Sequence, residues 1–317
     1  MAVEFGLAGL GLVILLLAGD ILVKGAVNLS LRLGIPALIV SLTIVAFGTS
    51  APELLISIQS ILAGVPGLAL GNVVGSNTAN ILLVLGVPAI ISGLHAASDT
   101  RRSYLIMIGG SLVFIALAFV GPFIWWHGLI LLALLTYILL DTARSASAHR
   151  SSAADVPTEG IELEEADPDM PWWKIGLFLS AGLAGLPLGA DLLVDSSVAI
   201  ATAYGVSETV IGLTLVAIGT SLPELATTVV AAIRRHADVA LGNVIGSNMF
   251  NLLGIIGVSA LVGPIPVDPE ILRFDIWVML AASAVLAPFV LWRWSMGRLV
   301  GVIFIALYAG YLALLLI

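Results

Sequence analysis

The sequence contains no cysteine and few charged residues. Of its 317 residues 10% are charged, none is cysteine and 60% are hydrophobic. The absence of cysteine excludes disulfide bonds and thiolate metal sites. Soluble globular domains carry about 25% charged residues, so the shortage of charge excludes that class of protein. A mean hydropathy of +1.16 and 33 glycines, which are frequent in transmembrane helices, indicate a polytopic membrane protein.

Apolar runs long enough to cross a bilayer occur in two sets of five. A transmembrane helix needs about 20 mostly apolar residues. The first set lies near residues 5–30, 36–62, 68–94, 103–121 and 124–143. The second set lies near 172–200, 207–233, 238–263, 274–292 and 298–316. The predicted fold is therefore all-α, with one five-helix unit at 1–144, a linker at 145–171 and a second five-helix unit at 172–317.

The linker is polar and carries most of the net charge of −8. Its acidic residues are Asp155, Glu159, Glu162, Glu164, Glu165, Asp167 and Asp169. Calcium-binding loops need acidic residues at alternate positions followed by glycine, and the linker lacks this spacing. It is therefore interpreted as a solvated connection and not as a calcium sensor.

The distribution of Lys and Arg predicts the orientation of the chain. Basic residues concentrate in cytoplasmic loops of membrane proteins. If the N-terminus is outside, eleven of the twelve Lys and Arg residues fall on the inner side, and Arg273 is the exception. Both termini are then outside and the linker is cytoplasmic. The N-terminal apolar run has no basic region before it and continues past Asp20, so we expect a retained helix and not a cleaved signal.

The two halves of the chain are related by an internal repeat. Residues 39–86 align without a gap to residues 210–257, at an offset of 171 positions, and 21 of the 48 aligned pairs are identical. Because each half contains five spans, an odd number, the second half must enter the membrane with the opposite polarity. Inverted repeats of this kind occur in many secondary transporters, whose substrate sites lie at the repeat interface near the bilayer midplane.

The first repeated motif is Gly-Thr-Ser-x-Pro-Glu, which ends at Glu53 and again at Glu224. A charge in the membrane costs at least about 2.5–3.5 kcal/mol, so an intramembrane Glu indicates a functional site. Pro52 and Pro223 lack an N–H group and should interrupt their helices. The carbonyls freed in this way are tolerated in lipid only where they line a cavity or are buried in protein.

The second repeated motif is Gly-Asn-x-x-Gly-Ser-Asn-x-x-Asn, at residues 71–80 and 242–251. Its polar residues are four positions apart and therefore share a helix face: Asn72, Ser76 and Asn80, then Asn243, Ser247 and Asn251. Taken singly, proline kinks and small-residue stripes are usually packing features. Together the four motifs offer carboxylate, hydroxyl, amide and carbonyl oxygens, which suit Ca²⁺ or Na⁺ better than a soft transition metal.

In these motifs the chain resembles the cation/calcium exchanger superfamily, in particular the short prokaryotic sodium/calcium exchangers. The resemblance covers nearly the whole chain and implies an antiporter that exchanges Na⁺ for Ca²⁺. By this resemblance Glu53 and Glu224 would be the central Ca²⁺ ligands, with the carbonyls of Thr49 and Thr220. The Na⁺ sites would contain Ser50, Ser76, Ser221, Ser247 and the carbonyls of Ala46 and Ala217. Asn80 and Asn251 would line the middle of the cluster.

One residue departs from the family pattern. Many sodium/calcium exchangers have Asp at the position of Asn251, so this chain has two carboxylates in the cluster in place of three. Two carboxylates neutralise one Ca²⁺, whereas three Na⁺ would leave a surplus buried charge, which is costly. The stoichiometry, the Na⁺ affinity or the coupling ion is therefore expected to differ. Proton-coupled Ca²⁺ exchange on the same fold is the alternative.

Two aspartates outside the repeated motifs are candidates for supporting roles. Asp20 and Asp191 are equivalent in the repeat, and each could assist ion access or hold a helix in place; Lys24, one turn from Asp20, could neutralise it. An aspartyl protease using both would leave the repeated motifs unexplained, and a passive channel would show no counter-transport. We expect a transporter of the prokaryotic plasma membrane that is not an enzyme, uses no cofactor and binds no nucleic acid.

Overall fold

The computed structural model describes residues 2–64, 66–96, 100–152, 167, 169–204 and 217–315. The regular elements in these ranges are helices, and the β pairing found there consists of two isolated bridges. Nine helices of the described ranges are long and apolar enough to cross a membrane. Part of the predicted helix 207–233 lies outside the described residues, and the rest includes a shorter apolar helix, Leu222–Ile233. The all-helical membrane fold is thus confirmed.

The first half contains helices α1 to α8. Their bounds are α1 Ala2–Leu33, α2 Ala37–Val40, α3 Ala46–Thr49, α4 Ala51–Leu62, α5 Gly67–Ala79, α6 Gly86–Ile91, α7 Thr100–Val120 and α8 Trp125–Ser152. Two π-helical turns join neighbouring helices, Ser41–Val45 between α2 and α3 and Asn80–Val84 between α5 and α6. Helix α8 continues to Ser152, so the polar segment predicted at 145–171 begins inside this helix and not after it.

The described residues of the second half contain helix α9 and helices α11 to α17. Their bounds are α9 Trp172–Ala203, α11 Ala217–Gly219, α12 Leu222–Ile233, α13 Ala237–Met249, α14 Ile256–Val262, α15 Ile276–Val285, α16 Ala287–Leu291 and α17 Arg298–Leu315. The π-helical turns described there are Phe250–Ile255, between α13 and α14, and Ile271–Asp275, before α15. Such turns are rare and frequently mark functional sites.

The element bounds repeat at the offset found in the sequence. Helices α4 and α12 begin and end 171 positions apart, and the span 100–120 corresponds in the same way to 271–291. The sequence identity covers only residues 39–86 and 210–257, so the structural repeat reaches further than the recognisable sequence repeat. Helix positions persist after side chains have diverged because the membrane fixes span length.

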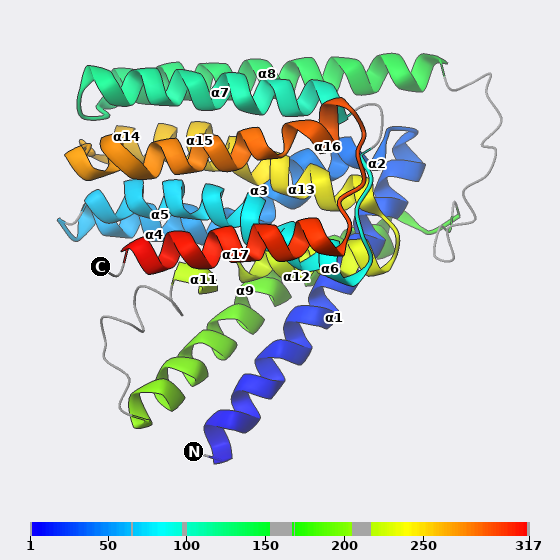
Figure 1. Cartoon of the computed structure of the whole chain (residues 1–317). Coiled ribbons are helices and arrows are strands. Elements are labelled where there is room, and N and C mark those ends of the chain that lie inside the picture. The colour runs from blue at the N-terminus through cyan, green and yellow to red at the C-terminus, as the bar shows by residue number, and fades with distance from the viewer. Residues whose placement is uncertain are drawn as a thin grey trace.

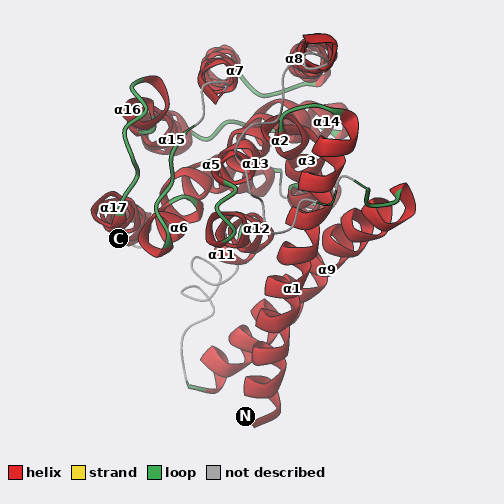
Figure 2. Cartoon of the chain, turned by 90° about the vertical axis from the view of Figure 1, so that its right-hand side faces the viewer, coloured by secondary structure: helices red, strands yellow, loops and turns green. Residues whose placement is uncertain are grey.

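Two helices, α5 and α13, lie at the centre of the molecule (Figure 2). The spans that contain them are 72% and 83% buried, whereas the other long spans are 22–44% buried. The second repeated motif occupies these two helices, so its polar residues are at the centre and not on the lipid-facing surface. Two β bridges, Leu94 with Met296 and Phe123 with Ile265, join loops of the first half to loops of the second.

Helices α1 and α9 run beside each other at a steep angle to the remaining helices (Figure 1). Glycines bring their backbones together: a Cβ atom on Gly189 would lie 2.8 Å from the backbone nitrogen of Leu15. A Cβ atom on Gly11 would lie 2.7 Å from the backbone nitrogen of Leu193 in α9. Close approach through small residues is a usual mode of helix association in membranes.

Candidate functional site

The first repeated motif breaks the helix at the same place in both halves. Ser50 separates α3 from α4 with φ −86° and ψ 3°, and Ser221 precedes α12 with φ −92° and ψ 4°. Each proline lies in the first turn of the following helix, where its missing N–H costs nothing. Glu53 and Glu224 lie in the same first turns, where the helix dipole favours negative charge. The predicted interruption is confirmed.

Both glutamates are completely buried, with 0% of their surface exposed. The two motifs are in direct contact, because the hydroxyl of Ser50, three residues before Glu53, donates to Glu224. Among the described residues, neither carboxylate oxygen of Glu53 and only one of Glu224 has a hydrogen-bond partner. A buried charge without a partner is strongly destabilising unless a counter-charge satisfies it. A bound cation would therefore stabilise the two buried carboxylates.

The side chains around Glu224 come from both halves of the chain. The hydroxyl of Ser50 donates to Glu224 Oε1 at 3.2 Å, and that of Ser247 approaches the same oxygen at 3.5 Å. Thr49 Oγ1 lies 3.2 Å from Asn243 Oδ1 and 3.4 Å from Ser247 Oγ. Hydroxyl hydrogen bonds are normally about 2.7–2.8 Å long, so these contacts are loose. We call Thr49, Ser50, Glu53, Glu224 and Ser247 the central cluster.

The second repeated motif adds amide groups next to the central cluster. Asn80 Nδ2 donates to Asn248 Oδ1 at 3.0 Å, and Asn248 Nδ2 donates to the Asn77 carbonyl at 3.4 Å. This network leaves Asn80 Oδ1 and both polar atoms of the Asn251 amide buried and without a partner among the described residues. Unsatisfied buried polar groups are costly, and a bound ion or water would satisfy them.

The remaining predicted residues have the following positions. Ser221 is buried, and its hydroxyl has no partner among the described residues. Ser76 and Thr220 line a cavity of about 370 Å³ between α5, the π-helical turn 271–275 and α17. The Ala46 carbonyl was predicted to bind Na⁺. It already accepts hydrogen bonds from the Ser50 N–H at 3.0 Å and from Thr49 Oγ1 at 3.2 Å. Ala217 begins α11, and its side chain lies outside the described residues.

Two asparagines that position the cluster, Asn243 and Asn248, were not among the predicted ligands. Asn248 accepts from Asn80 and donates to the backbone carbonyl of Asn77, and Asn243 contacts Thr49, Thr228 and the Glu224 carbonyl. Both are identical to their counterparts in the repeat, so their identity at the 171-position offset was a usable signal. The contacts themselves join helices from different halves and could not be read from spacing.

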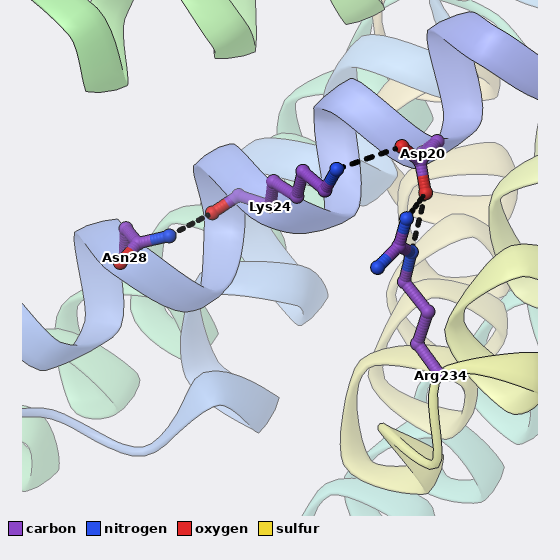
Figure 3. A network of polar contacts seen from close by, with 4 residues as sticks. All are labelled: Asp20, Lys24, Asn28 and Arg234. Atoms are coloured by element: carbon purple, nitrogen blue, oxygen red, sulfur yellow. Dashed lines mark hydrogen bonds and ion pairs between the residues drawn. The ribbon is translucent and has the colours of Figure 1, made fainter. Parts of the chain in front are cut away.

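The two repeat-related aspartates have different surroundings. Asp20 forms ion pairs with Lys24, at 3.2 Å, and with Arg234 at the end of α12 (Figure 3). Lys24 was predicted to neutralise Asp20, which is confirmed, whereas Arg234 was missed because it is 214 positions away. Asp191 instead lines a cavity of about 140 Å³ with Asp195, Pro52 and Thr220. The pair is therefore structurally asymmetric despite its equivalence in sequence.

The oxygens of this region define the kind of ion it suits. Carboxylate, hydroxyl and amide oxygens are preferred by hard cations such as Ca²⁺ and Na⁺. In the described part of the chain no group of three His, Cys, Asp or Glu residues gathers as a metal site. The arrangement thus resembles a hard-cation site with two carboxylates and many neutral oxygens.

Comparison with known proteins identifies relatives along nearly the whole chain. The family model described as sodium/calcium exchanger protein matches residues 3–140 and 174–317. The sodium/calcium exchanger MaX1 of Methanosarcina acetivorans is 34% identical over 346 residues, covering 99% of this chain and 99% of that protein. The inner membrane protein YrbG of Escherichia coli is 35% identical over 309 residues, covering 96% of this chain and 94% of YrbG.

A solved structure shares the same fold. In one structure of the sodium-calcium exchanger NCX_Mj the sequence identity is 32% and the TM-score is 0.84. The match covers 98% of this chain and 98% of that protein. The similarity extends over both halves, including the helices that carry the repeated motifs.

Proposed function

Because the chain belongs to the sodium/calcium exchanger protein family, we propose that it exchanges Na⁺ for Ca²⁺ at the central cluster. Its relatives are membrane exchangers and not enzymes, so the chain is a cation exchanger of this class. The identity of the coupling ion, the ligands and the alternating exposure of the site to the two sides of the membrane are proposals.

One observation carries the proposal. Two fully buried glutamates, one from each half, have three carboxylate oxygens without a hydrogen-bond partner among the described residues. Burial of two carboxylates that repel each other is unfavourable unless positive charge lies between them. One Ca²⁺ would balance both charges, and its preference for six to eight oxygens fits the surrounding hydroxyls and amides.

The proposed ligands are those that the resemblance to sodium/calcium exchangers implies. Glu53 and Glu224 hold Ca²⁺, and the same carboxylates hold Na⁺ when Ca²⁺ is absent. The supporting ligands are Thr49, Thr220, Ser50, Ser221, Ser76, Ser247, Asn80, Asn251 and the carbonyls of Ala46 and Ala217. Since both ions need the same two carboxylates, binding is mutually exclusive, and this exclusion supplies the exchange.

Transport also requires that the cluster open in turn to each side of the membrane. We propose an inverted-topology repeat with both termini outside and the central linker in the cytoplasm of a prokaryotic cell. We propose that the pair of α1 and α9, which runs at a steep angle to the other helices (Figure 1), moves between the two states. A ligand shifts such an equilibrium only by its different affinity for the two states.

Asn251 affects the number of ions exchanged. With two carboxylates, Ca²⁺ leaves the cluster neutral, whereas three Na⁺ would leave one uncompensated positive charge in a medium of low dielectric constant. We therefore propose that fewer Na⁺ are bound per Ca²⁺ than in exchangers with Asp at this position. The unpartnered Glu53 carboxylate is also the observation that favours the proton-coupled alternative, because it could accept a proton when Ca²⁺ leaves.

The direct test is flux into proteoliposomes containing the purified protein. An outwardly directed Na⁺ gradient is expected to drive uptake of ⁴⁵Ca²⁺, and removal of internal Na⁺ to stop it. Uptake that does not depend on Na⁺ and is driven by a pH gradient would contradict the proposal and indicate proton-coupled exchange. Ca²⁺ flux that needs no counter-ion would indicate a passive channel.

A further inference from the structure

Among the carboxylates that lie within membrane spans outside both motifs, Asp275 lines a cavity with proposed ligands. Asp275 ends the π-helical turn 271–275 and belongs to the apolar span Ile271–Leu291. Acidic residues within spans are rare and usually face the interior or a water-filled cavity. Asp275 is not explained by the exchange mechanism above.

Asp275 lines the same cavity as two proposed ligands. The polar residues around this cavity of about 370 Å³ are Asn72, Ser76, Thr220, Asp275, Tyr308 and Tyr311. Ser76 is only 3% exposed, so the cavity reaches from Asp275 into the buried part of the second motif. It therefore connects a carboxylate just before the start of α15 with residues of the candidate cation site.

The charge of Asp275 is not neutralised by a neighbouring base. The hydroxyl of Tyr311 donates to Asp275 Oδ1 at 2.9 Å, and no ion pair to Asp275 is found among the described residues. Arg273, two positions earlier, is exposed. The cavity is thus negatively charged, and clefts lined by one sign of charge raise the local concentration of counter-ions.

The first half of the chain has no carboxylate at the position equivalent to Asp275. The residue equivalent to Asp275, 171 positions earlier, is Tyr104, whose hydroxyl donates to the Ser283 carbonyl at 3.0 Å. In an inverted repeat, equivalent positions lie in opposite halves of the membrane. Only one side of the protein then carries the carboxylate, and in the orientation proposed above it is the outer side.

We propose that Asp275 recruits Na⁺ and Ca²⁺ from the outer solution into the cavity that leads to Ser76 and Thr220. This inference rests on the proposed function and adds to it a residue that sets cation affinity on one face. Asp275 also supplies a third negative charge near a cluster in which Asn251 provides none. It is a recruiting residue and not a ligand of the central ions.

The first test compares Asp275→Asn with Glu270→Gln. Asn keeps the shape of Asp and can accept the Tyr311 hydrogen bond, while Glu270 is exposed, lies before the same span and is not in the cavity. Initial ⁴⁵Ca²⁺ flux is measured with Ca²⁺ presented to each face, in right-side-out and in everted membrane vesicles. The half-saturating Ca²⁺ concentration on the outer face should rise about three- to tenfold in Asp275→Asn.

The inner-face value and the maximal rate should stay within about twofold of wild type, and Glu270→Gln should change neither. Equal shifts on both faces, or no shift, would overturn the inference. A similar shift in Glu270→Gln would also overturn it, because it would show that any outer charge has this effect.

A second test does not depend on transport. The chain has no cysteine, so Leu68→Cys places a single thiol at the cavity. Positively charged methanethiosulfonate reagents should modify it several times faster than negatively charged ones, and Asp275→Asn should reduce this ratio. An unchanged ratio, or a thiol that neither reagent reaches, would overturn the inference even if Na⁺/Ca²⁺ exchange holds. If exchange proves proton-coupled, the expected ratio is the same.

Discussion

At the scale of single residues, Glu53 and Glu224 have unequal surroundings. Glu224 has hydroxyl groups of Ser50 and Ser247 near one oxygen, while both oxygens of Glu53 lack a partner among the described residues. The sequence repeat makes the two glutamates equivalent, but the packed helices distribute their neutral partners unevenly. Glu53 therefore depends more completely on a bound cation for compensation of its charge.

We expect Glu53→Gln and Glu224→Gln each to abolish Ca²⁺ transport. Either change removes one of the two negative charges that compensate Ca²⁺. Removing one partner from a buried pair of opposite charges costs about 3–5 kcal/mol, so the affinity for Ca²⁺ should fall by at least about two orders of magnitude. The measurement is Na⁺-driven ⁴⁵Ca²⁺ uptake, with size-exclusion chromatography to confirm folding. Because Gln removes a carboxylate repulsion, the variants should fold. Transport retained in either variant would contradict the ligand assignment.

Asn251→Asp should increase the charge moved per Ca²⁺. The substitution gives the cluster a third carboxylate, which can compensate an additional Na⁺. Current and ⁴⁵Ca²⁺ flux recorded on the same proteoliposome preparation give this ratio. An unchanged ratio in a variant that still transports would show that Asn251 does not set the stoichiometry.

At the scale of structural elements, the contact between α1 and α9 depends on glycines. The backbones approach so closely at Gly189 that a Cβ atom would lie 2.8 Å from the Leu15 nitrogen and 3.0 Å from the Gly11 carbonyl oxygen. Neither backbone atom can move without shifting a helix. The ion pair of Asp20 with Arg234 adds a polar contact between α1 and the end of α12 (Figure 3).

Gly189→Ala should destabilise the protein, and Gly176→Ala should not. Overpacking at a close contact costs about 1–3 kcal/mol. Gly176 lies on the same helix α9 and has no atom within 4 Å of its virtual Cβ, so the Ala there gains helix propensity of up to about 1 kcal/mol. Thermal unfolding in detergent measures both effects. Equal stability of the two variants would show that α1 and α9 can separate freely at this point.

At the scale of the whole molecule, the repeat predicts which loops share a side of the membrane. Asp169 lies before α9 and Glu270 lies after α14, and both are exposed. With both termini outside, Asp169 is cytoplasmic and Glu270 is external. The bridges that join the two halves, Leu94 with Met296 and Phe123 with Ile265, then lie on the inner and outer sides respectively.

Asp169→Cys and Glu270→Cys should react with a membrane-impermeant maleimide from opposite sides. The wild-type chain lacks cysteine and serves as the unlabelled control. In right-side-out vesicles we expect labelling at 270 and protection at 169, and the reverse in everted vesicles. Labelling of both positions from the same side would exclude the inverted arrangement.

Much of the fold and part of the site could be predicted from the sequence. Hydropathy determines the spans because lipid imposes a fixed length, and the repeat identified both glutamates with their motifs because these residues are close together along the chain. The broken helices at Ser50 and Ser221 followed from the prolines two positions later. These features depend on local chemistry and on the membrane, which the sequence specifies directly.

Only the tertiary structure decided which residues meet across the halves. The hydroxyl of Ser50 reaches Glu224, Arg234 reaches Asp20, and Asp275 shares a cavity with Ser76. Each pair is separated by more than 170 positions, and its contact depends on how the helices pack and not on spacing. The sequence by itself determined that two buried carboxylates must be compensated; the packing determined which oxygens surround them and which cavity leads to them.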